Sequence, residues 1–323
     1  MAGWYINKRQ IWANSITEWR VGWFTNFNKW KYFWWSSELK WLARNTESNM
    51  PTARRWMIVV TDWVKIYCIW WNNNQRTNEE YDPLTDTWAT KANMTTWRSF
   101  FAWGYINWKI YAIWSGSSPY NYNEEYDISG NTWATKANTI SSRAYATASV
   151  VNNKIYYIWW FIYNPTPTLS NKNEEYDPLT DTWATKANMP ISNADLTSSA
   201  LNWKIYCIWG SGSWISTNVN YEYNVAGNTW TSKTSMPTAR RYLASATIGN
   251  YIYCMWWTVM GLTDLDLNER YNTVNDTWAT KIPMLTGRRY LWLASVWNII
   301  YVIGWSSASW ASNKNESYNP DND

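Results

Sequence analysis

The chain has 323 residues, a formal net charge of +4 and no histidine. A charge this small, with Lys and Arg scattered along the chain, does not indicate a nucleic-acid surface. The missing histidine removes the commonest general base and the commonest metal ligand, so composition weighs against an enzyme. We therefore predict no catalytic residue, no cofactor and no metal site.

The N-terminal residues, MAGWYINKRQIWANSITEW, are too polar for the apolar region of a signal peptide. No window reaches the uninterrupted apolar length of a membrane span. We expect a protein without a membrane span. A surface rich in Asn, Thr and Ser favours a secreted or cell-surface protein of bacterial type, and a cytoplasmic location stays open.

A seven-residue run, KIYCIWW at Lys65 to Trp71, recurs five more times with small changes. The Ile of the Ile-Tyr pair stands at residues 66, 110, 155, 205, 252 and 300, which gives a period of 44 to 50 residues. A second marker, the Trp of an NTW or DTW group, keeps the same rhythm at residues 88, 133, 183, 230 and 278. Two markers in phase predict a repeat architecture.

Each repeat contains four short runs rich in Ile, Val, Tyr, Thr and Trp, separated by Asn, Asp, Pro or Ser. Such runs predict strands joined by turns, and nothing has the length or period of a helix. In YDPLTDTW, at Tyr81 to Trp88 and again at Tyr176 to Trp183, Asp and Pro occupy the first positions of a β-turn. Four strands per repeat without a helix predict an all-β propeller with one blade per repeat.

The repeats resemble the kelch family from Arg54 to Pro320. The kelch pattern is an apolar strand that ends in a glycine pair, a strand with Glu and Tyr, and a strand with Trp; the Tyr and Trp positions match throughout, whereas the glycine pair does not. The structural repeat positions that carry the match are Tyr81, Trp88, Tyr126, Trp133, Tyr176, Trp183, Tyr223, Trp230, Tyr271 and Trp278. This resemblance implies a kelch-type propeller of four-stranded blades.

We predict six blades, with units near 54–97, 98–142, 143–192, 193–239, 240–287 and 288–323. The last unit lacks its Trp strand, and Leu39 to Pro51 ends in the same Asn-Met-Pro that follows the Trp strand at Asn188 to Pro190. We therefore expect a closing strand within residues 38–51, which makes 1–37 a divergent segment and 38–323 the propeller. Lys29 to Trp35, KWKYFWW, leaves seven blades as the alternative.

The kelch glycine pair is absent as such: Trp70-Trp71, Trp159-Trp160 and Trp256-Trp257 occupy it, whereas Trp209-Gly210 and Gly304-Trp305 are mixed. Trp also stands where Asn-Gly would form a tight hairpin, at Asn107-Trp108 and Asn202-Trp203. Trp297 parallels Gly249, and Trp97 parallels Gly287. Our hypothesis is that these tryptophans are native glycines, mistranslated from a genome that reads the codon UGA as glycine. The rival interpretation is a genuine aromatic surface that stacks on sugars or peptides.

The three cysteines, Cys68, Cys207 and Cys254, fall at one apolar position of the repeat, so we expect packing residues without a disulfide. Two charged sets recur once per blade and predict structural ion pairs within or between blades. The arginines are Arg54, Arg98, Arg143, Arg240 and Arg288. The glutamates are Glu80, Glu125, Glu175, Glu222, Glu269 and Glu316.

Function is expected where the repeats differ, in the loops after the glycine-pair position. These loops span Asn72 to Asn78, Gly116 to Asn123, Phe161 to Asn173, Ser211 to Asn220, Thr258 to Asn268 and Ser306 to Asn315. The candidate binding residues are Asn72, Asn74, Tyr120, Tyr122, Tyr163, Asn164, Ser213, Asp264 and Ser307. We predict a non-catalytic binding or scaffold module for a protein or glycan. A carbohydrate-active enzyme, epimerase-like or lyase-like with a site in the central channel, is the alternative.

Overall fold

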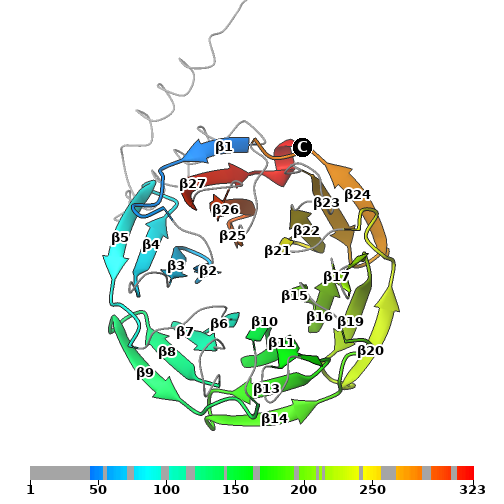
Figure 1. Cartoon of the computed structure of the whole chain (residues 1–323). Coiled ribbons are helices and arrows are strands. Elements are labelled where there is room, and N and C mark those ends of the chain that lie inside the picture. Colours follow the sequence, from blue (N-terminus) through cyan, green and yellow to red (C-terminus); the bar gives the residue numbers. More distant parts are fainter. Residues whose placement is uncertain are drawn as a thin grey trace, which may run out of the picture. The chain divides into compact units, whose positions relative to one another are not determined.

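The computed structural model describes residues 44–53, 57–70, 76–95, 102–113, 121–141, 144–162, 168–192, 196–208, 211–212, 215–239, 243–255, 267–285, 292–306 and 311–323. These residues form six antiparallel sheets, each with a path of four strands, arranged as blades around a central axis (Figure 1). The predicted six-bladed all-β propeller is confirmed. The seven-bladed alternative is wrong for the described part of the chain, and Lys29 to Trp35 lies outside it.

The first three blades follow the sequence order from the axis outwards. Blade 1 contains β2 (Met57–Thr61), β3 (Ile66–Trp70), β4 (Asn78–Asp82) and β5 (Thr87–Lys91). Blade 2 contains β6 (Ala102–Ile106), β7 (Lys109–Ile113), β8 (Asn123–Asp127) and β9 (Thr132–Lys136). Blade 3 contains β10 (Ala144–Val151), β11 (Lys154–Ile162), β13 (Asn173–Asp177) and β14 (Thr182–Lys186), with the short β12 (Thr168–Leu169) paired to β11.

The next two blades repeat this order. Blade 4 contains β15 (Thr197–Leu201), β16 (Lys204–Ile208), β19 (Asn220–Asn224) and β20 (Thr229–Lys233). A separate hairpin between its second and third strands pairs β17 (Ser211–Gly212) with β18 (Ile215–Ser216). Blade 5 contains β21 (Ala244–Ile248), β22 (Tyr251–Met255), β23 (Asn268–Asn272) and β24 (Thr277–Lys281).

Blade 6 draws its strands from both ends of the repeat region. It contains β25 (Trp292–Val296), β26 (Ile299–Ser306) and β27 (Ala311–Tyr318), followed by the 3₁₀ turn η1 (Pro320–Asn322). Its outermost strand is β1 (Arg44–Glu47), which pairs antiparallel with β27 from Arg44 opposite Tyr318 to Glu47 opposite Asn315. The predicted closure of the ring by an N-terminal strand is confirmed.

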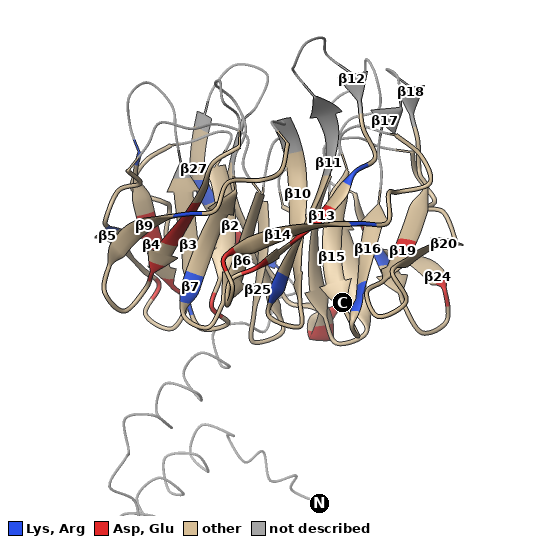
Figure 2. Ribbon diagram, turned by 90° about the horizontal axis from the view of Figure 1, so that it is seen from below, with Lys and Arg blue, Asp and Glu red and all other residues tan. Residues whose placement is uncertain are grey.

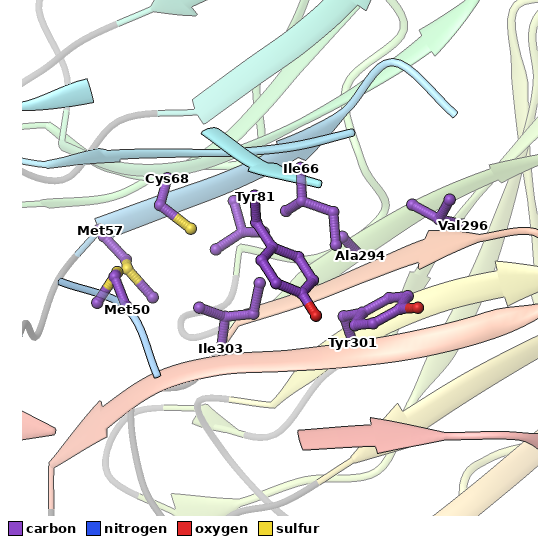
Figure 3. Packing of buried hydrophobic residues seen from close by; sticks show 10 residues of the cluster. Met50, Met57, Ile66, Cys68, Tyr81, Ala294, Val296, Tyr301 and Ile303 are labelled. Atoms are coloured by element: carbon purple, nitrogen blue, oxygen red, sulfur yellow. The ribbon is translucent and has the colours of Figure 1, made fainter. Parts of the chain in front are cut away.

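The hydrophobic core lies between the blades, because the second and third strands of each blade are buried on both faces. In blade 1, Ile66 to Ile69 and Asn78 to Tyr81 are all buried. The cluster at the closure of the ring combines Val59 and Tyr81 of blade 1 with Tyr301 and Ile303 of blade 6, together with Met50 (Figure 3). Each blade therefore completes the core of its neighbour.

A hydrogen-bonded latch joins each blade to the preceding one. A tyrosine hydroxyl on the third strand donates to an Asp or Asn five residues later, in the turn to the fourth strand. In blade 3, Tyr176 donates to Asp181 (2.6 Å), and Asp181 also accepts the backbone N–H of Ala137 in blade 2 (2.8 Å). The latch acceptors are Asp86, Asn131, Asp181, Asn228, Asp276 and Asp323.

The fourth strand adds a second contact between blades. The indole N–H of Trp183 donates to the carbonyl oxygen of Ala137 at 2.8 Å, and its ring lies 4.9 Å from that of Tyr176. The same pair of contacts is made by Trp88, Trp133, Trp230 and Trp278. In blade 6, Arg44 occupies this position and its guanidinium donates to the carbonyl oxygen of Pro283 at 2.7 Å.

We predict that Asp181→Ala destabilises the protein by about 2 kcal/mol, because the Tyr176 hydroxyl and the Ala137 N–H both lose their acceptor. Asp181→Asn is the matched control, because Asn131 and Asn228 make the same contacts in blades 2 and 4. Urea unfolding measures both. Equal stability of Asp181→Ala and wild type would show that the latch contributes nothing.

Candidate functional site

Because the strands of each blade are antiparallel, the two ends of the propeller carry different kinds of connection. Connections after the second and fourth strands of every blade emerge at one end, which we call the loop face. Tight turns after the first and third strands emerge at the other end, the turn face. Figure 2 shows the blades from the side, between these two ends. The variable connections of the repeats therefore share one face.

Most of the predicted binding residues belong to these connections and lie outside the described residues. They are Asn72, Asn74, Tyr120, Tyr163, Asn164, Ser213, Asp264 and Ser307. The remaining one, Tyr122, directly precedes β8 and is partly buried. It packs against the cluster that contains Ile58 and Tyr126. The structure thus gives this residue a packing role at the base of its loop.

Charged side chains cross the blades between the second, third and fourth strands. In blade 3, Glu175 contacts Lys154 on the second strand (2.8 Å) and Lys186 on the fourth strand (3.0 Å). It also accepts the hydroxyl of Tyr156 at 2.6 Å. Lysines surround the corresponding glutamates Glu80, Glu125 and Glu222 in the same way.

The predicted row of six equivalent glutamates is wrong in its register. Glu269 and Glu316 pair opposite Cys254 and Val302, as Glu79 pairs opposite Cys68, whereas Glu80 pairs opposite Tyr67. Arg270 and Ser317 occupy the Glu80 position in blades 5 and 6. The predicted partners Arg54, Arg98, Arg143, Arg240 and Arg288 lie outside the described residues. Blades 1 to 3 have two neighbouring glutamates in NEEY, whereas blades 5 and 6 have NERY and NESY, which keep only the first of the two. The first and the second glutamate point to opposite faces of the strand, so the single glutamate of blades 5 and 6 is not equivalent to Glu80.

The glutamates of the Glu79 row are buried beneath the loop face. Glu79 accepts the hydroxyl of Thr52 at 3.0 Å, and Glu269 accepts that of Thr238 at 2.9 Å. Both threonines precede the first strand of the same blade, so these contacts anchor the connection that enters it. Blade 4 departs from the pattern, because Tyr221 stands in the row of Glu79, Glu124, Glu174, Glu269 and Glu316.

Hydroxyl groups connect the innermost strands of blades 3, 4 and 5. Ser198 contacts Thr147 (2.8 Å) and Ser149 (2.9 Å) of blade 3. One blade further on, Ser245 contacts Thr197 (2.7 Å) and Ser199 (2.8 Å) of blade 4. The equivalent contact between blades 5 and 6 is apolar, made by Leu293 with Ala244 and Ala246. The contacts between innermost strands are therefore polar from blade 3 to blade 5 and apolar between blades 5 and 6.

The cysteines are not placed as reactive groups. Cys68, Cys207 and Cys254 are buried thiols in three different clusters of the core. Burial raises the pKa of the Cys207 thiol, which makes it a poor nucleophile.

In the described ranges, no group of three or more acidic, Cys or His side chains is placed to hold a metal ion. No helix within these ranges has the length and apolar character needed to cross a membrane.

Four tryptophans project from hairpins of the turn face with a left-handed backbone. Their φ angles are 73° at Trp63, 64° at Trp108, 63° at Trp203 and 47° at Trp297. All four side chains are exposed, Trp203 by 71%. Asn precedes Trp108 and Trp203 with φ near +50°, as in a type I′ turn, and Gly249 at the position of Trp297 has φ of 55°.

Comparison with known proteins agrees with this architecture. Residues 142–190 match the family model described as the kelch motif. Among solved structures, the chain is similar to YjhT, with a TM-score of 0.71 and 13% sequence identity over 83% of this chain and 95% of that one. No curated protein matches. The chain thus carries a kelch motif within a six-bladed propeller of kelch type, and a likeness at this identity shows the fold alone.

We predict that the Glu175 network stabilises the protein above about pH 4.5 and that this contribution is lost in acid. Burial opposes ionisation, but hydrogen bonds from Lys154, Tyr156 and Lys186 outweigh it and lower the pKa of Glu175 from 4.5. A lowered folded-state pKa stabilises above the unfolded-state value and loses this effect as pH falls through the folded-state value.

In denaturant unfolding from pH 7 to pH 3, Glu175→Gln is expected to be less stable than wild type at pH 7. The difference should shrink steadily below about pH 4.5. Thr182→Gln, an exposed change on the outer strand of the same blade, is the control and should show no such trend. A constant difference across this range would contradict the role of the charge.

Proposed function

We propose that this protein is a binding module whose loop face recognises a protein or a glycan. The observation that carries the proposal is that the shared residues and the variable residues of the repeat lie in different places. The residues shared by the blades are occupied in latches, ion pairs and core packing between blades. The connections of the loop face differ from blade to blade, so they are free to carry recognition on a rigid support.

The innermost strands favour a binder over the enzyme alternative. Their sequences, MIVVT, AWGYI, AYATASVV, TSSAL, ASATI and WLASV, contain no carboxylate and no basic group. The described channel wall therefore lacks the Glu and Arg that an epimerase-like or lyase-like site would use for proton transfer.

The test is binding by the purified chain to a glycan array and to biotinylated cell-surface proteins. We expect Tyr163→Ala with Asn164→Ala, in the longest connection, to weaken binding by about tenfold, since a lost contact of this kind costs about 1.4 kcal/mol. Thr85→Ala, in an exposed turn of the opposite face, is the control and should bind normally. If the folded protein bound neither a glycan nor a cell-surface protein, the proposal would fail and the propeller would be interpreted as a structural spacer.

We also propose that the exposed turn-face tryptophans are glycines in the native protein. Two classes of tryptophan support this. Trp88, Trp133, Trp183, Trp230 and Trp278 donate their indole N–H to a neighbouring blade and stack on a tyrosine. Trp63, Trp108, Trp203 and Trp297 are exposed and have positive φ, which glycine adopts at no steric cost.

This second proposal extends the UGA hypothesis to Trp63 and stands against the interpretation of the turn face as an aromatic binding surface. The gene is expected to carry UGG at the five indole-donating positions and UGA at the four positive-φ positions. It should also carry UGA at Trp70, Trp71, Trp159, Trp160, Trp256 and Trp257. UGG at the positive-φ positions would overturn the assignment.

We predict that Trp203→Gly raises the free energy of unfolding by about 1 kcal/mol, because glycine removes the left-handed strain of a hairpin residue. Trp183→Gly is the matched change in the other class. It should destabilise the protein by about 3 kcal/mol or more through loss of a packed ring and its hydrogen bond. Thermal and urea unfolding of the two variants measure the contrast.

A further inference from the structure

Blade 5 carries a charge of opposite sign at the centre of its third strand. Arg270 of β23 lies opposite Tyr253 of β22, at the register position where blades 1 to 4 have a glutamate opposite a tyrosine. Each of those glutamates, Glu80, Glu125, Glu175 and Glu222, forms ion pairs with two lysines. Blade 5 therefore has a cation where its counterparts have a carboxylate.

Two neighbouring charged positions change together with Arg270. In blade 2, Lys109 pairs opposite Asp127, and blades 1 and 3 contain the same pair of charges. In blade 5, Tyr251 pairs opposite Asn272 at these two positions. The blade thus gains a guanidinium and at the same time lacks both carboxylates of the equivalent patch.

The guanidinium of Arg270 is held by an aromatic ring near the turn face. Its central carbon lies 4.0 Å from the ring centroid of Tyr251, a distance at which a cation is attracted to the face of the ring. Tyr251 is the first residue of β22, directly after the turn at Gly249 and Asn250, and it packs against the cluster that joins blades 5 and 6. Arg270 and Tyr251 are both partly exposed, so a solute can reach the guanidinium.

No carboxylate of the described residues forms an ion pair with Arg270. The acidic group of blade 6 at this joint, Asp323, is already in use. It pairs with Lys281 at 3.1 Å and accepts the hydroxyl of Tyr318 and the backbone N–H of Ile282. The fork of N–H donors on Arg270 is therefore not matched by a carboxylate in this part of the structure.

The tyrosine opposite Arg270 does not supply a negative charge either. In blades 2 to 4 the equivalent hydroxyl donates a hydrogen bond to the glutamate. In blade 5 burial raises the pKa of the Tyr253 hydroxyl, and the nearby charge of Arg270 only partly opposes this effect. Tyr253 thus stays protonated at neutral pH.

We propose that Arg270 is the centre of an anion site at the joint of blades 5 and 6, open to the turn face, which takes a carboxylate or a phosphate. Both groups present two oxygens on one atom, which match the parallel N–H donors of a guanidinium. A bound anion would supply the negative charge that the protein itself supplies in blades 1 to 4. The site lies on the face opposite the proposed recognition surface and contains no tryptophan, so it depends on neither function proposed above.

NMR of the full chain, labelled with ¹⁵N at arginine side chains, tests the proposal. Sodium phosphate and sodium acetate are titrated separately at constant ionic strength, with sodium chloride making up the balance, so that screening does not change. The Nε–H signal of Arg270, assigned by its absence in Arg270→Lys, is expected to shift and to saturate with a dissociation constant of about 1 mM. Tighter binding of acetate identifies a carboxylate ligand, and tighter binding of phosphate identifies a phosphate ligand. Absence of saturation with both anions would overturn the proposal.

A double variant tests the same site by stability. Tyr251→Lys with Arg270→Glu rebuilds the lysine and glutamate of blades 1 to 4 and removes the cation. At about ten times its dissociation constant, the tighter anion is expected to raise the Tm of the wild type by about 2 °C relative to chloride, but not that of the double variant. Lys109→Gln, which removes a cation already paired with Glu125, is the control and should keep the rise. An equal rise in all three proteins would show that the anion acts elsewhere and would contradict the site.

Discussion

The latch between a tyrosine hydroxyl, a turn carboxylate or amide, and the backbone N–H of the preceding blade is the contact on which the ring depends. Asp181 shows why: one oxygen accepts both the hydroxyl of Tyr176 and the N–H of Ala137. The turn that presents it has a left-handed residue, with φ of 54° at Asp181. A single side chain thus sets the conformation of its own turn and the position of the neighbouring blade.

The latch explains why residues that recur in every blade are poor candidates for recognition. Trp183 and Tyr176 stack on each other and donate hydrogen bonds to acceptors between blades, so the N–H and O–H donors of both side chains are already used within the fold. Glu175 is likewise surrounded by two lysines and a tyrosine. The proposed recognition surface follows from this, because the residues that differ between blades lie in the connections between the second and third strands.

In blade 6 the outermost strand comes from a segment far from the other three strands in the sequence. β1 keeps a hydrogen bond to each neighbouring blade. Ser48 donates its N–H to Asp86 (2.8 Å), whereas Arg44 donates to the carbonyl oxygen of Pro283, one residue beyond the position that accepts the indole N–H in the other blades. β1 does not preserve the aromatic ring or the lysine. Strand pairing is therefore continued all around the ring, whereas the side chains of the outermost strand differ in blade 6.

Much of the fold was readable from the sequence, because periodicity is a property of the chain: the Ile-Tyr and Trp markers predicted six four-stranded blades, and the Asn-Met-Pro at residues 49–51 predicted the closing strand. The partners of the charged residues were not readable. The lysines at 65 and 91 recur with Glu80, yet the glutamate row was assigned in the wrong register, because neighbouring strand residues point to opposite faces. Only the tertiary structure decided which face each side chain occupies, and it alone placed Glu47 and Asp86 around the hydroxyl of Tyr81, because Glu47 comes from a segment that no repeat relates to blade 1.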